Sequence, residues 1–218
     1  MNPDATAIDK IKQIYPKIHL SIQDKLCIFN KIWVEDNETA AFLELAFCLF
    51  TPQSKAEASW ETVLLLKKNR QLLVADEAQL SRSMARVRFR NTKARYLVEA
   101  RQQFIREDQI RIIKELKGLP QSEELRQWLV SRVKGFGLKE ASHFLRNIGA
   151  SFDYAILDRH ILKQMQSIGI LADLPNSLSA KTYQQIEQLL IRFSESVQIP
   201  MGELDLLFWF IANGKLFK

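Results

Sequence analysis

The sequence predicts an all-α fold. Apolar residues recur at intervals of three and four along most of the chain, which is the spacing of one face of a helix. No stretch shows the sustained apolar–polar alternation of a half-buried strand between turn residues. Only 7 glycines and 6 prolines occur in 218 residues, so long loops and linkers are scarce. A chain of this length can bury one large core or two small ones.

Each helix is expected from its own stripe of apolar residues. The run 40–50 is the most apolar, but Glu44 interrupts it and it is too short to span a bilayer, so we expect a buried core helix. Asn91 precedes the next long stripe and is a good N-cap residue. Two stripes then flank a short turn, and a long one runs from Tyr183 to Val197. The predicted helices are residues 5–14, 21–34, 38–50, 54–69, 76–86, 91–107, 122–133, 138–148, 158–168, 180–197 and 201–213.

Composition excludes several kinds of site. Cys27 and Cys48 lie within apolar helical patterns, so we expect two buried thiols in a reducing cytosol and no disulfide. Two cysteines and three histidines are too few for a four-cysteine zinc or iron–sulfur site, so neither a metal nor a cofactor is expected. The first residues lack the apolar core of a signal peptide. We therefore expect a cytoplasmic protein.

Positive charge is concentrated in one segment. The chain has a net charge of +6, and eight basic residues against one acid, Glu99, fall between Arg82 and Arg106. The rest of the chain is close to neutral. A basic segment on a near-neutral body is typical of a surface that binds a polyanion, and Arg88 and Arg90 are its DNA-binding candidates. The alternative is a solvated basic helix face.

Residues 133–139, Val-Lys-Gly-Phe-Gly-Leu-Lys, form a turn between two amphipathic stripes. The chain must reverse here within a few residues, and glycine reaches the positive φ angles that other residues resist, so we expect such angles at Gly135 and Gly137. Phe136 would lie between the two helices. The free N–H groups and positive dipole end of the second helix favour an anion. We expect a DNA phosphate there, bound without sequence preference, although an ordinary helical hairpin has the same pattern.

A lysine and an aspartate follow this turn. Lys139 lies two residues after Gly137, and Asp158 comes 19 positions later. A lysine is usually a solvated surface charge, but a helix N-terminus disfavours a cation and so favours the neutral amine that can attack as a nucleophile. Asp158 precedes a plausible helix start, where it can act as an N-cap and stay a rigidly held carboxylate. This pair predicts an enzyme that acts on nucleic acid.

These residues carry a resemblance to a known family. Leu129–Gly149, followed by residues 155–162, resembles the catalytic core of the helix-hairpin-helix DNA glycosylase superfamily. Ala46–Ser54 resembles the buried helix and turn that open this core, and Phe89–Ala94 resembles its Asn-x-Lys-Ala helix start.

The end of the chain narrows the resemblance, which extends over about residues 40–218. Trp209 and the closing residues 214–218 are similar to the type 2 8-oxoguanine DNA glycosylase/lyases. The four cysteines of iron–sulfur relatives and the N-terminal β-domain of the eukaryotic-type enzymes have no counterpart in this sequence, which also fits type 2.

The resemblance implies a bifunctional DNA repair enzyme that excises 8-oxoguanine. The target nucleotide would be flipped out of the duplex, because its sugar carbon cannot be reached in the stack. Lys139 would attack C1′ and displace the base, while Asp158 would help to deprotonate the amine and stabilise the positive charge that develops on the sugar. The resulting Schiff base leads to β-elimination on the 3′ side. An amine can form this imine, whereas a water activated by a carboxylate would only hydrolyse the glycosidic bond.

The resemblance also implies residues around the base and the DNA. Phe89 and Trp209 are candidates to stack on bases, with ordinary core packing as the alternative for each. The C-terminal lysine of the family lies in the base pocket, and here it is Lys218. Gln53 would fill the gap left by the flipped base, or else cap a helix. His160 would contact a phosphate, or else be a buried structural histidine.

We expect two helical subdomains with a DNA- and base-binding cleft between them. Residues 37–150 would form the hairpin-containing helical barrel, and residues 1–36 with 151–218 the second subdomain. The expected partner is double-stranded DNA containing an oxidised base, so we expect the protein to be associated with the nucleoid. The expected state is a monomer, and no membrane is involved. Two alternatives stay open: a bifunctional glycosylase for oxidised pyrimidines, with the same core and another pocket, and a non-catalytic helix-hairpin-helix DNA-binding protein.

Overall fold

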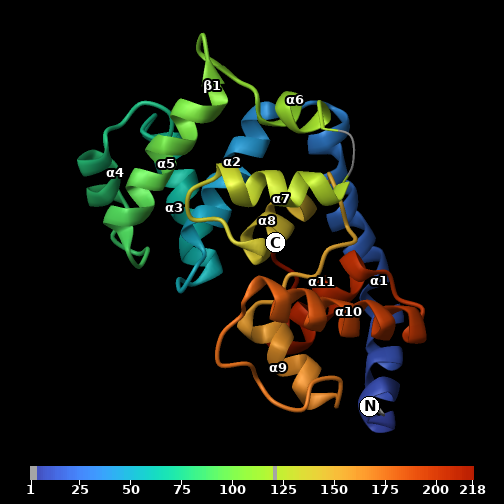
Figure 1. Ribbon diagram of the computed structural model, residues 1–218. Coiled ribbons are helices and arrows are strands. Elements are labelled where there is room, and N and C mark those ends of the chain that lie inside the picture. Colours follow the sequence, from blue (N-terminus) through green and yellow to red (C-terminus); the bar gives the residue numbers. More distant parts are fainter. Residues whose placement is uncertain (1–3, 120–121) are drawn as a thin grey trace. The chain divides into compact units, whose positions relative to one another are not determined.

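The computed structural model describes residues 4–119 and 122–218. Within these ranges every regular element is a helix except one pair of two-residue strands (Figure 1), which confirms the predicted all-α class. The chain divides into two compact units: unit 1 comprises Met1–Lys31 and Leu145–Lys218, and unit 2 comprises Ile32–Phe144. No helix in the described ranges combines the length and the apolar character of a membrane span.

Unit 2 is built around α2. Every residue from Ala41 to Phe50 is buried, because this helix is apolar on all sides and has neighbours on several. Helices α3, α5 and α6 contact α2, and α4 packs against α5 (Figure 1). The helices that contribute to this unit are α2 (Glu38–Phe50), α3 (Ala56–Lys68), α4 (Glu77–Ser83), α5 (Arg90–Phe104), α6 (Ile112–Lys117), α7 (Ser122–Arg132) and the first residues of α8 (Leu138–Asn147).

Unit 1 is centred on α11, which contacts both α9 and α10. Its first residues are almost all buried, with Leu204, Leu206 and Leu207 fully enclosed. The unit also contains most of α1 and the end of α8. The bounds of its helices are α1 (Ala5–Val34), α9 (Arg159–Ser167), α10 (Ala180–Val197) and α11 (Met201–Asn213).

The first helix differs from the prediction. Two helices were expected at residues 5–14 and 21–34, but α1 is one continuous helix with Pro16 inside it. Proline removes one helical hydrogen bond, yet the helix continues because it buries a single stripe of residues. Ile11, Ile22 and Phe29 are its buried residues, separated by about three and two helical turns. Cys27 lies off this stripe and is exposed, so the expectation of a buried thiol is wrong there, whereas Cys48 is buried.

The other nine predicted helices are found with ends displaced by three residues or fewer. The segment after α5 was missed. Strands β1 (Ile105–Arg106) and β2 (Gln109–Ile110) form an antiparallel hairpin, and both turn residues, Glu107 and Asp108, have positive φ. A two-residue strand has no periodicity to detect. Helix α6 was missed as well, because it is one and a half turns long.

The start of α5 also differs in detail. Asn91 was expected as the N-cap, but Phe89 occupies that position with φ 57° and Asn91 lies in the first turn. The Asn91 side chain instead accepts a hydrogen bond from the Ser81 hydroxyl of α4. The left-handed conformation at Phe89 opens the helix in place of a side-chain cap.

Candidate active site

The hairpin joins α7 to α8 in unit 2. Gly135 has φ 92°, as predicted, and a Cβ atom there would lie 2.5 Å from Cδ2 of Tyr96. Both the backbone angle and the contact with Tyr96 therefore require glycine. Phe136 is buried and packs against Phe144 of α8, with ring centroids 6.1 Å apart.

Gly137 acts differently from the expectation. Its φ is not positive, so the predicted need for glycine's backbone freedom is wrong here. Gly137 is the N-cap residue of α8, since its carbonyl accepts from the Ala141 N–H at 3.0 Å. Its own N–H donates to Oε2 of Glu140 at 3.2 Å. A phosphate can therefore bind this amide only if it displaces the Glu140 carboxylate.

Lys139 occupies the first turn of α8 and is partly shielded. Its side chain is 22% exposed and that of Glu140 is 14% exposed. The Lys139 Nζ lies 2.8 Å from Oε1 of Glu140. The candidate nucleophile thus has a carboxylate in direct contact, and this partner was not among the residues predicted from the sequence.

A second lysine, Lys93 of α5, was also missed as a site residue. Its side chain is buried, and its amine donates to the carbonyls of Phe50 (2.7 Å) and Pro52 (2.6 Å) and to the hydroxyl of Ser54 (3.2 Å). Burial and the nearby positive charge of Lys139 lower the pKa of Lys93 to about 8, against the opposing effect of a carboxylate. Its sequence signal was the Asn-x-Lys-Ala match, which gave no role to the lysine.

Lys93 and Ser54 hold two exposed loops, one that carries Gln53 and one that carries Phe89. The Ser54 hydroxyl accepts from Lys93 and also from the Arg88 N–H at 3.0 Å. Gln53 and Phe89, one in each loop, are both exposed and both left-handed, with φ 55° and 57°. Non-glycine residues rarely adopt this conformation, and such strain often accompanies function. The two candidate DNA-contacting residues are therefore fixed by one buried amine and one hydroxyl.

The alternatives raised for these two residues do not fit the structure. Phe89 is 56% exposed, so it is not a core residue. Gln53 is not a helix cap, because Thr51 is the C-cap of α2 and Lys55 is the N-cap of α3. The Arg88 guanidinium lies over the Phe89 ring, 5.5 Å from its centroid.

Only some basic side chains of the segment 82–106 lie on the surface. Arg88 and Arg90 are exposed, as a DNA contact requires. Lys93 and Arg101 are buried, and Arg101 donates to the carbonyl of Ala75 at 2.6 Å. These two charges serve the interior of unit 2, so the segment offers fewer groups to a polyanion than its sequence suggests.

Asp158 belongs to unit 1 and is the N-cap of α9, as the sequence predicts. Its Oδ1 accepts from the N–H groups of His160 and Ile161, both at 2.8 Å. These two bonds fix the orientation of the carboxylate and leave Oδ2 outside them.

His160 and Trp209 meet in unit 1. Their ring centroids are 5.3 Å apart in an edge-on arrangement. His160 is exposed, so the alternative of a buried structural histidine is wrong. Trp209 is half-buried, and its indole nitrogen has no hydrogen-bond partner among the described residues. Lys218, just beyond α11, is partly buried.

A buried ion pair near Asp158 was not foreseen. Asp205 of α11 lies 3.5 Å from Nη1 of Arg146, whose guanidinium stacks on Phe29 at 5.2 Å. Burial raises the pKa of Asp205 to about 6, the charge of Asp158 acts in the same direction, and Arg146 opposes both. Arg146 is itself buried, so its charge serves the interior of unit 1.

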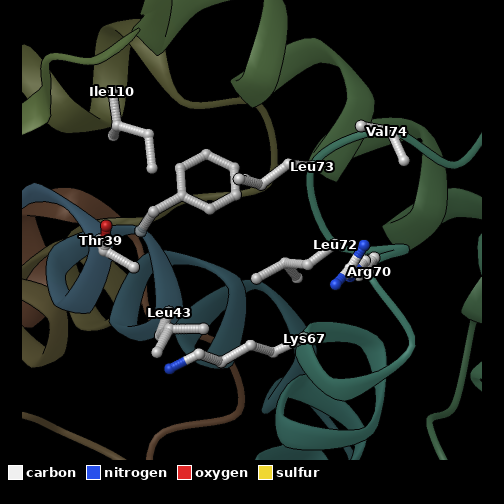
Figure 2. Close-up of a pocket in the computed structure, with 9 residues that line it drawn as sticks. Thr39, Leu43, Lys67, Arg70, Leu72, Leu73, Val74 and Ile110 are labelled. Carbon is white, nitrogen blue, oxygen red and sulfur yellow. The ribbon is translucent and has the colours of Figure 1, made fainter. Parts of the chain in front are cut away.

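An apolar cavity of about 290 Å³ lies elsewhere in unit 2. Figure 2 shows the side chains of Leu43, Leu72 and Ile110 around it, with Lys67 and Arg70 among its lining residues. None of the predicted site residues lines it. Within the described ranges, no cluster of three or more His, Cys, Asp or Glu side chains could hold a metal ion.

The all-α fold, the hairpin with its lysine and the capped aspartate define a chain of the helix-hairpin-helix DNA glycosylase class. The family model described as 8-oxoguanine DNA glycosylase matches residues 22–199. The chain belongs to this family.

Individual relatives match over nearly their full length. An 8-oxoguanine DNA glycosylase/AP lyase of Fusobacterium nucleatum is 38% identical over 210 residues, which cover 96% of this chain and 97% of the relative. The crystal structure of a Methanocaldococcus jannaschii 8-oxoguanine glycosylase/lyase, in complex with a 15mer DNA containing 8-oxoguanine, is similar with TM-score 0.86 and 31% identity, covering 97% and 99% of the two chains. The Thermotoga maritima 8-oxoguanine DNA glycosylase structure gives TM-score 0.85 at 28% identity, covering 97% and 98%.

Proposed function

We propose that this protein is a bifunctional DNA repair glycosylase and AP lyase that excises 8-oxoguanine from double-stranded DNA, with Lys139 as its nucleophile. The observation that carries the proposal is a partly shielded lysine at the start of the second hairpin helix, in a chain whose relatives with that activity match it end to end. The protein needs no cofactor for this chemistry, and we place its action on chromosomal DNA in the cytoplasm.

The proposed reaction begins with the oxidised nucleotide outside the stack, because C1′ is inaccessible in the duplex. The Lys139 amine attacks C1′, the glycosidic bond breaks, and the base leaves with the bonding electrons. The Lys139–sugar adduct opens to a Schiff base, from which β-elimination cuts the strand on the 3′ side. The carboxylate of Asp158, held by two backbone amides, stabilises the positive charge that develops on the sugar.

The remaining site residues divide between base and backbone. Trp209 and Phe89 offer aromatic faces for stacking, and the proposal gives Lys218 a place in the recognition of the oxidised base. The exposed Gln53 would occupy the space left in the duplex.

Three further site residues would contact the DNA backbone. Arg88 and Arg90 are exposed cations suited to phosphates, and His160 is exposed at the start of α9. With the hairpin glycines, they would fix the duplex without reading its sequence.

Borohydride trapping tests the proposal. Native protein incubated with a duplex containing 8-oxoguanine and reduced should form a covalent DNA adduct, and Lys139→Gln should form none. Lys134→Gln, which alters an exposed lysine of the same hairpin, is the matched control and should trap like the native protein. If no lesion gives an adduct, the protein is not a lyase. Faster trapping on thymine glycol than on 8-oxoguanine would make it a glycosylase for oxidised pyrimidines.

A further inference from the structure

The carboxylate of Glu140 contacts two functional groups of the hairpin at once. Its Oε1 lies 2.8 Å from Lys139 Nζ, and its Oε2 accepts from the Gly137 N–H. Neighbouring residues in a helix ordinarily point in different directions. The contact forms because Glu140, in the third helical position, turns back over the helix start to bond the N-cap amide, as in a capping box.

Attack by Lys139 requires its amine to lose a proton first. The proton needs an acceptor within hydrogen-bonding distance of Nζ, which is the geometric condition for a general base. Oε1 of Glu140 meets that condition. The other amine in this part of unit 2, Lys93, is no acceptor, because it donates its hydrogens to two carbonyls and a hydroxyl.

We propose that Glu140 is a catalytic residue that accepts the proton of the Lys139 ammonium; the inference rests on the proposed function, in which Lys139 is the nucleophile. The proton moves from Nζ to Oε1, leaving a neutral amine and a carboxylic acid. The amine lone pair forms the bond to C1′ while the glycosidic bond breaks, so the departing base carries a negative charge. The Glu140 carboxylic acid then gives its proton to the base. The base departs as a neutral molecule, and Glu140 is a carboxylate again.

This assignment separates the two carboxylates of the site. Glu140 moves a proton at the nucleophile, a step in which the resemblance implied help from Asp158. Asp158, whose Oδ1 is fixed by two amides, then acts only by its charge on the sugar. The assignment also predicts whether removing the Glu140 carboxylate speeds or slows formation of the adduct. A carboxylate that merely holds the ammonium in an ion pair inhibits attack, so its removal would speed adduct formation. A carboxylate that accepts the proton is required, so its removal slows it.

The test is the single-turnover rate of the borohydride-trapped adduct, measured with saturating native protein, Glu140→Gln, Glu140→Asp and Glu99→Gln. Glu99 is a half-exposed carboxylate paired with Arg95 and serves as the matched control. At pH 7, Glu140→Gln should be slower than native by about 100-fold or more, the usual contribution of a general base. Glu140→Asp should be slowed less, and Glu99→Gln not at all. Raising the pH to 9 should speed Glu140→Gln more than native, because hydroxide then removes the proton.

Each outcome either supports or overturns the proposed role of Glu140. A Glu140→Gln rate equal to or above native overturns the proposal, and so does a slowed rate with no extra gain at pH 9, since that pattern belongs to a structural role. If Glu140→Gln does not fold, as judged by circular dichroism, Glu140→Asp decides: a slowed rate with a gain at pH 9 supports the proposal, and the native rate refutes it. Absence of an adduct in the native protein would instead refute the lyase function itself.

Discussion

Replacing Gly135 by alanine should destabilise the protein through two separable effects. A residue with a side chain at φ 92° pays for the left-handed region, at about 1–2 kcal/mol. The new Cβ would also lie 2.5 and 2.7 Å from two ring carbons of Tyr96, and such overpacking costs about 1–3 kcal/mol. Together they predict a loss of about 3 kcal/mol, or a fall in Tm of about 6–12 °C for a chain of this size.

Two other glycines provide matched controls. Gly214 has φ 73° with nothing within 4 Å of an added Cβ, so Gly214→Ala should show the backbone effect alone, about 1–2 kcal/mol. Gly137→Ala has neither a positive φ nor a contact closer than 3.4 Å, so it should melt close to native. Thermal unfolding followed by circular dichroism ranks the three variants.

The double variant Gly135→Ala, Tyr96→Ala isolates the clash. Removing the ring should make the alanine at 135 less costly than it is in the native background, a coupling that a double-mutant cycle measures. A Gly135→Ala variant that melts no lower than Gly214→Ala, or a cycle with no coupling between positions 135 and 96, would show that the Cβ does not clash with Tyr96.

The remaining predictions concern charge and recognition. Because the pKa of Asp205 is raised to about 6, this carboxyl should add about 2–3 kcal/mol to stability as the pH falls from 7 to 4; denaturant unfolding of Asp205→Asn should lack that rise relative to native. Lys93→Met should lower the free energy of unfolding by about 2 kcal/mol, since its acceptors lose a donor, yet still form the trapped adduct. Arg88→Ala should reduce the salt dependence of DNA affinity, measured by fluorescence anisotropy, by about one unit of log–log slope. Deleting Lys218 should slow 8-oxoguanine excision more than cleavage at a preformed abasic site; equal losses would place it outside base recognition.

Local patterns were enough to predict most helices and the capped aspartate. Helical periodicity depends only on residues within a few turns, and the Asp158 cap depends on the two amides that follow it. The exception, α1, shows the limit of local reasoning. Pro16 predicts a break, but the burial of Ile11, Ile22 and Phe29 on one stripe keeps the helix continuous.

Contacts between distant residues could not be predicted. Glu38 accepts from the first amides of α6, 75 and 76 positions away, at 2.9 and 3.0 Å, and nothing near either segment signals it. The Arg146–Asp205 pair spans two helices, so its raised pKa had no sequence signature. The Glu140–Lys139 contact was missed for the opposite reason, since adjacent residues are not expected to face each other in a helix.

Lys93 and Lys139, both in unit 2, differ in burial and in the contacts of their amines. The pKa of Lys93 is lowered to about 8, so its amine loses a proton closer to neutral pH than an ordinary lysine does. A nucleophile must also reach its substrate and present a free lone pair. Lys93 is 5% exposed and its nitrogen donates to three acceptors. Two of them, on Pro52 and Ser54, flank Gln53 in its turn. Lys139 is more exposed and has a carboxylate at its amine that can take the proton. These contacts support the proposal that Lys139 attacks the sugar and that Lys93 holds the loops that carry Gln53 and Phe89.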